Sequence, residues 1–117
     1  MTNAELVEAL CSVSTPLREA RRVHLDTYGI LIPHVFMADV LKRIGACLGA
    51  SRAGSPDTYI PEVQGILATL ERGMAEGGRE TVNVIAISFT RDSELEMFAE
   101  QLRSLMGPRT RAQLQGR

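Results

Sequence analysis

Apolar side chains recur every three to four residues through almost the whole chain, and this spacing constrains the fold more than any other feature. In residues 3–13 they include Leu6, Leu10 and Val13, which share one face of an α-helix. The chain contains no Trp, and only 4% of its residues are aromatic. Its core must therefore be aliphatic, which favours packed helices. We predict an all-α fold, a short HEAT- or armadillo-like stack of about six to seven helices.

Proline and glycine mark where these helices begin and end. Pro33 and Pro61 each precede a periodic segment, and proline favours the first position of a helix. Gly107 and Pro108 break the sixth helix, because neither residue continues a helix well. We expect helices near residues 3–13, 15–28, 33–48, 61–76, 81–90, 93–106 and 108–114, within one domain spanning 1–117. A mobile loop is expected at 49–58 and a frayed tail at 115–117.

Residues 81–90 are ambiguous between a helix and a strand. Their β-branched residues favour a strand, but Val82, Ile85, Ala86 and Phe89 also fit one helix face. A central strand would have no evident partner in this chain. We therefore predict a buried helix, paired with the helix that follows it.

Charge is divided unevenly along the sequence. Residues 57–100 carry nine acidic and three basic side chains, whereas residues 101–117 carry four arginines and no acid. No basic stripe of the kind that follows nucleic-acid phosphates is present. We expect no nucleic-acid partner and instead a basic protein partner. The residues expected to meet it are the carboxylates around two predicted turns: Glu71, Glu76, Glu80, Asp92, Glu94 and Glu96.

No pattern typical of a catalytic, metal or cofactor site occurs in the sequence. His24 and His34 are ten residues apart, and the two cysteines, Cys11 and Cys47, form no CxxC pair, so ligand spacing for a metal is missing. Ser88 lacks the flanking glycines of a nucleophile elbow. We expect no catalytic residue, no metal, no cofactor and no enzyme activity. An enzyme would require a deep polar pocket around His34, Asp39 and Ser88.

The polar residues singled out also have structural interpretations. His34, directly after Pro33, is expected to hold the loop that enters the third helix. Asp39 is expected to pair with or cap a neighbouring helix, and Ser88 to bond back to its own helix. The two cysteines are expected to be buried as small apolar residues.

Four phrases in the sequence resemble a family of small, uncharacterised bacterial helical domains. The first runs from Tyr28 to Val40 and contains Leu-Ile-Pro-His-Val followed by Asp39. The others are residues 70–73, residues 82–89, which include Ser88 and Phe89, and residues 106–108, which include Gly107 and Pro108. The chain departs from the pattern at residues 90–92, where an acidic residue and an asparagine would be expected.

The resemblance implies a HEAT-like fold similar to immunity proteins, which bacteria encode beside the toxins they neutralise. The first functional hypothesis is therefore an immunity protein that occludes a cognate toxin domain. The alternative is a non-catalytic scaffold or adaptor that joins a complex or self-associates, for example as a homodimer. The sequence contains no apolar run long enough to span a membrane and no signal peptide, so we expect a cytoplasmic protein without a membrane partner.

Overall fold

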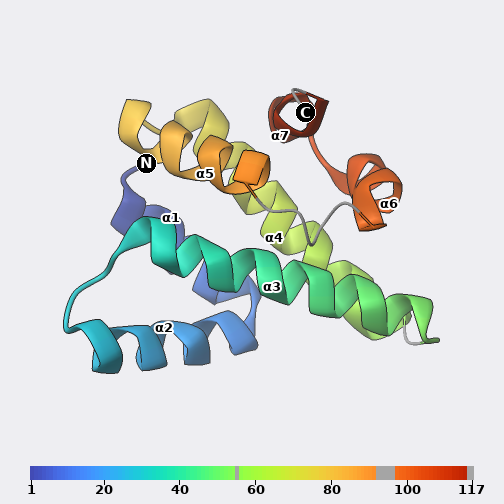
Figure 1. Ribbon diagram of the computed structural model, residues 1–117, viewed down its shortest axis with the longest axis horizontal. Coiled ribbons are helices and arrows are strands. Elements are labelled where there is room, and N and C mark those ends of the chain that lie inside the picture. The colour runs from blue at the N-terminus through green and yellow to red at the C-terminus, as the bar shows by residue number, and fades with distance from the viewer. Residues whose placement is uncertain (55, 92–96, 116–117) are drawn as a thin grey trace.

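The computed structural model describes residues 1–54, 56–91 and 97–115, and the residues it describes contain helices and no strand (Figure 1). The all-α stack predicted from the sequence is confirmed, with seven helices in these segments. They are α1 (Asn3–Val13), α2 (Thr15–Tyr28), α3 (Pro33–Arg52), α4 (Pro56–Glu76), α5 (Arg79–Arg91), α6 (Ala99–Leu105) and α7 (Pro108–Gln115).

Helix α3 lies at the centre of the molecule because its neighbours cover it on several sides. It packs against α2, α4 and α5, while α1 packs against α2 and α4. Figure 1 shows α2 running antiparallel to the first half of α3. Seven side chains of α3 are buried, including Phe36, Val40 and Ile44. A wide apolar face of this helix is therefore buried against its neighbours. Cys11 and Cys47 are free and buried, as predicted.

The predicted loop at 49–58 is wrong in extent, because helices occupy most of it. Helix α3 continues to Arg52, and α4 begins at Pro56. The Arg52 guanidinium stacks on the Phe98 ring, 4.6 Å from its centroid, and donates a hydrogen bond of 3.1 Å to the Met97 carbonyl. These contacts hold the last turn of α3. Pro61, predicted to start the fourth helix, lies inside α4.

The ambiguous segment at 81–90 forms part of helix α5, as predicted. Its buried residues are Thr81, Val84 and Ile85, so the inward face is offset from the predicted one, which included Val82. Gly73 of α4 allows the two helices to approach closely. A Cβ atom at Gly73 would lie 2.8 Å from the Ile85 Cδ1 atom.

The last helices pair differently from the prediction. Helix α5 packs against α3, α4 and α7, and α6 packs against α7; no α5–α6 pair of the expected kind is formed among these residues. The predicted start of the sixth helix at residue 93 lies outside the described residues. Gln115, predicted to belong to the frayed tail, is the last residue of α7, and residues 116–117 lie outside the described part. Over the segments described, no helix combines the length and the apolar character needed to cross a bilayer.

Candidate protein-binding surface

Helix α2 is the least buried of the long helices, and its burial depends on few side chains. Ser14 is its N-cap, with its hydroxyl accepting a bond from the Leu17 backbone N–H. Only Leu17 and His24 of this helix are buried. Gly29 ends the helix in the left-handed conformation, with φ of 76°, a backbone angle that favours glycine. Most of the surface of α2 therefore faces outward.

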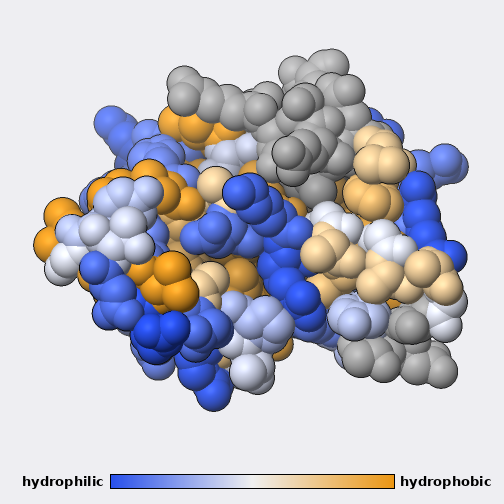
Figure 2. Space-filling model, turned by 60° about the horizontal axis from the view of Figure 1, so that its bottom comes forward, coloured by the Kyte–Doolittle hydropathy of each residue, from blue (hydrophilic) through white to orange (hydrophobic). Residues whose placement is uncertain are grey.

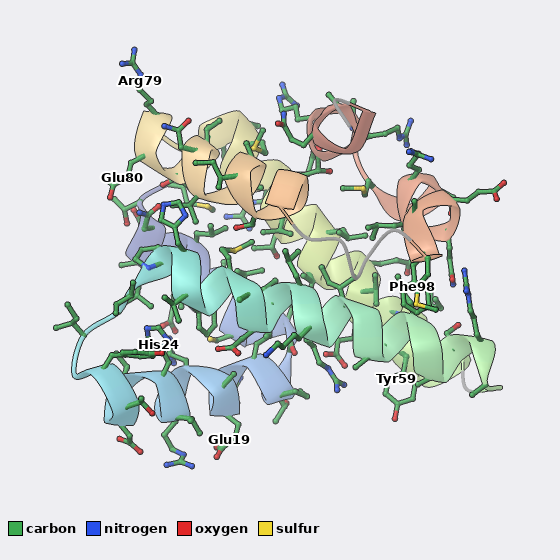
Figure 3. All side chains as sticks on the ribbon, in the orientation of Figure 1. Glu19, His24, Tyr59, Arg79, Glu80 and Phe98 are labelled. Atoms are coloured by element: carbon green, nitrogen blue, oxygen red, sulfur yellow. The ribbon has the colours of Figure 1, made fainter. Side chains whose placement is uncertain are left out.

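His24 fixes the connection between α2 and α3. The Ile32 backbone N–H donates a 2.9 Å hydrogen bond to the His24 Nε2 atom, and the His24 side chain is almost fully buried. Its ring lies 4.8 Å from the Tyr28 ring and meets Phe36 edge-on. Figure 3 shows His24 directed from α2 toward α3. The role predicted for His34 thus belongs to His24, because His34 is exposed and makes no hydrogen bond to any described residue.

Exposed apolar side chains are concentrated around this connection. Seven large apolar side chains are exposed among the described residues, and five of these lie between residues 23 and 35. Figure 2, which brings the lower side of Figure 1 forward, shows hydrophobic atoms among hydrophilic ones over α2. The five are Val23, Leu25, Tyr28, Ile30 and Val35, with exposures between 38% and 67%.

A groove of about 600 Å³ runs between α2 and α3. We call the groove and its lining the α2–α3 face. Its apolar lining includes Val23, Tyr28 and Val35, and two small residues, Ala20 and Ala38, also border it. Leu25 lies on the same helix as Val23 but does not line the groove. Clefts of about this volume are large enough to take up the apolar groups of a ligand.

Charged side chains on the α2–α3 face fall into two groups. Glu19 is held in an ion pair with Arg22 of its own helix. Asp39 and Lys42 of α3 line the groove, and neither makes a hydrogen bond or ion pair with the described part of the chain. The pairing or capping role predicted for Asp39 is therefore wrong within these segments.

Glu71, predicted to meet a partner, instead fastens α7 to α4. Its carboxylate accepts bonds from the backbone N–H groups of Arg109 (3.2 Å) and Thr110 (3.0 Å), which are otherwise unpaired at the start of a helix. It also pairs with the Arg109 guanidinium at 3.3 Å. Burial alone would raise the pKa of Glu71, but the hydrogen bonds from Thr110 and Arg109 outweigh it and lower the pKa.

The other predicted carboxylates do not form one acidic surface among the described residues. Glu76 pairs with Arg72 at 3.3 Å, and Glu80 accepts a 3.1 Å bond from the Asn3 side-chain amide. Figure 3 shows Glu80 and Arg79 together at the start of α5, so positive charge lies beside the carboxylates. Asp92, Glu94 and Glu96 lie outside the described residues.

The remaining motif residues have local structural roles. Pro33 opens α3 and Pro108 opens α7. Gly107 lies against the Glu71 carboxylate, since a Cβ atom there would be 2.6 Å away. The Ser88 hydroxyl donates a 2.7 Å bond to the Val84 carbonyl, as predicted. The side chain of Phe89 lies outside what the structure describes. Asp39 borders the α2–α3 groove, but His34 and Ser88 do not.

A partly buried ion pair that no local sequence pattern indicates joins three helices. The Arg43 guanidinium of α3 contacts both carboxylate oxygens of Glu62 of α4, at 2.6 and 2.8 Å. The Ser14 hydroxyl, at the start of α2, donates to the same carboxylate at 2.8 Å. The hydrogen bond from Arg43 is the main cause that lowers the pKa of Glu62, against the opposing effect of burial. Burial raises the pKa of the nearby Cys47 thiol to about 11.

Comparisons with known proteins assign no role to the α2–α3 face. No family model, curated protein or solved structure matches this chain. Among the described residues, no group of three or more His, Cys, Asp or Glu side chains is placed to hold a metal ion.

Proposed function

We propose that this chain is a protein-binding inhibitor of the immunity-protein type, which neutralises a cognate toxin domain in the cytoplasm by covering it. The observation that supports binding to a protein is the concentration of exposed apolar side chains between residues 23 and 35. Three of these side chains, Val23, Tyr28 and Val35, line the groove, and exposed apolar surface beside a groove is characteristic of interaction sites. The resemblance of residues 28–40 to immunity-like domains supplies the kind of partner.

In this proposal the α2–α3 face contacts the toxin. The partner inserts apolar side chains beside Val23, Tyr28 and Val35, and the water released from both surfaces makes dissociation slow. Asp39 and Lys42 fix the orientation of the partner, because neither is paired within the described part of the chain and each can form one ion pair.

The test is co-expression of the chain with the product of the neighbouring gene, scored by growth of the cells. Wild type should restore growth. Val23→Asp should lose this rescue, because it places a charge among the apolar residues of the groove. Leu25→Asp is the matched control: Leu25 is exposed to a similar degree, 41% against 49% for Val23, but lies outside the groove. A neighbour that is not toxic, or equal rescue by both variants, would contradict the proposal.

The alternative function is a non-catalytic scaffold that associates with other copies of itself. Asp39 and Lys42 favour it, because they share one surface and neither has a partner among the residues that the structure describes. A scaffold should assemble without rescuing cells from a toxin, so the same growth assay separates the two functions.

A further inference from the structure

We infer that a second copy of this chain covers the α2–α3 face, forming a weak symmetric dimer through α3. The inference rests on the proposed function only in assigning protein binding to the same face. A tighter partner would displace the second copy.

The charges on α3 are arranged as a symmetric contact requires. In a two-fold dimer the same patch meets itself, so every group must find its complement within the patch. Asp39 and Lys42 are three residues apart, so they lie about 4.5 Å apart along the helix axis and on neighbouring rows. Both line the groove and neither has a partner in the described part of the chain. If two α3 helices cross antiparallel with the axis between residues 40 and 41, Asp39 of each copy meets Lys42 of the other.

The same axis also places the neighbouring residues in register. It sets Val35 of one copy against Ala46 of the other. The midpoint of residues 35 and 46, like that of residues 39 and 42, lies between residues 40 and 41. Val35 and Ala46 are exposed, and with Asp39 and Lys42 they follow the i, i+4, i+7, i+11 spacing of one helix face. These four residues span about 16 Å, or three turns, of α3. Small residues such as Ala46 and Ala38 let two helices approach closely, and the half-exposed Tyr28 and Val23 flank the contact from α2.

The size of this surface predicts weak association. A stable interface buries about 800 Å² on each partner, which is about one eighth of the 6255 Å² surface of this chain. The contact reaches this area only if α2 joins α3 along most of its length. A dissociation constant in the micromolar range, on the order of 10 μM, is therefore expected.

The experiment is sedimentation velocity of the full chain from micromolar to millimolar concentration. Wild type should change from monomer to dimer across this range. D39K and K42D should each remain monomeric at concentrations about tenfold higher, because each sets like charges against one another across the axis. Glu100→Lys and Arg79→Asp are the matched controls: they make the same charge changes at exposed sites away from the face and should dimerise like wild type.

Two rescue measurements make the result specific. The double variant D39K/K42D should dimerise again, because the complementary pairs are restored with reversed sign. Mixing D39K with K42D should also produce a dimer, because every facing pair is then one cation and one anion. A monomeric wild type at millimolar concentration, single variants that still dimerise, or a mixture of the folded single variants that stays monomeric would each overturn the inference.

The growth assay distinguishes a failure of the dimer from a failure of toxin binding at the same face. If the double variant dimerises but no longer rescues cells, both the dimer and the toxin contact at this face stand. If wild type is monomeric yet Val23→Asp abolishes rescue, the dimer is wrong and the inhibitor proposal stands. If the dimer forms and Val23→Asp still rescues, the dimer stands and toxin binding at this face is wrong.

Discussion

Single residues in this molecule often act on a helix far away in the sequence. Glu71 belongs to α4, but its hydrogen bonds lie at the start of α7, 38 and 39 residues later. Gly107 is needed beside it because only a hydrogen atom fits against the carboxylate. Thr110, which also bonds Glu71 through its hydroxyl, is completely buried. The sequence predicts that Gly107 stops a helix but not that it makes room for Glu71.

Gly107→Ala should lower the free energy of unfolding by about 1–2 kcal/mol, because the new methyl group displaces the Glu71 carboxylate and leaves helix-start N–H groups unpaired. Urea denaturation followed by circular dichroism measures this loss. Gly78→Ala is the control, since a Cβ atom at Gly78 meets nothing within 4 Å, and its effect should stay within about 0.5 kcal/mol. Equal effects of the two substitutions would show that Glu71 does not hold α7 in this way.

At the scale of the helices, the distribution of buried residues sets which element opens first. Helix α3 buries seven side chains, whereas α2 buries only Leu17 and His24. Local unfolding of α2 therefore exposes fewer buried side chains than local unfolding of the core helices. Segments with less buried apolar surface open more readily.

Amide hydrogen exchange should consequently be faster in α2 than in α3, and His24→Leu should speed exchange in α2 further. The substitution removes the acceptor for the Ile32 N–H and frees the connection that His24 holds. Mass spectrometry of deuterated peptides measures both rates. His34→Leu, which alters an exposed side chain, should change neither rate. Protection of α2 equal to that of α3 would contradict the expectation.

Local patterns predicted most helices but not their partners. The first helix has the predicted bounds, and residues 33–48 and 81–90 are helical as expected. The extension of α3 to Arg52 depends on its contact with Phe98, 46 residues away, which no local pattern contains. The candidate site was predicted less well for the same reason. The exposure of Val23 and Tyr28 follows from which side of α2 meets α3, and the choice of His24 over His34 follows from the path of the connecting loop.

At the scale of the whole molecule, two partly buried carboxylates make the stability of the fold depend on pH. Glu62 and Glu71 both have a lowered pKa in the folded protein. An unfolded glutamate titrates near pH 4.3, so the folded state binds fewer protons than the unfolded state just above and below that pH. The stability these groups contribute is complete above that range and is lost as the pH falls through their folded pKa values.

The free energy of unfolding should therefore decrease as the pH falls from about 5 toward 3. Glu62→Gln should lower stability at pH 7, because it leaves Arg43 without its partner, and should reduce the loss on acidification. Urea denaturation at a series of pH values measures both effects. An acid dependence in Glu62→Gln that is as steep as in wild type would show that Glu62 does not contribute to it.

The Arg43–Glu62 pair also constrains how descendants of this chain can diverge. Replacing one member leaves an unpaired charge in a partly buried site between α3 and α4, which lowers the free energy of unfolding. Replacing both with apolar residues of similar size avoids this loss of stability. Evolution can therefore leave this pair only by two nearly simultaneous changes. In an alignment of related chains, positions 43 and 62 should covary, with opposite charges or two neutral residues together and few mixed combinations.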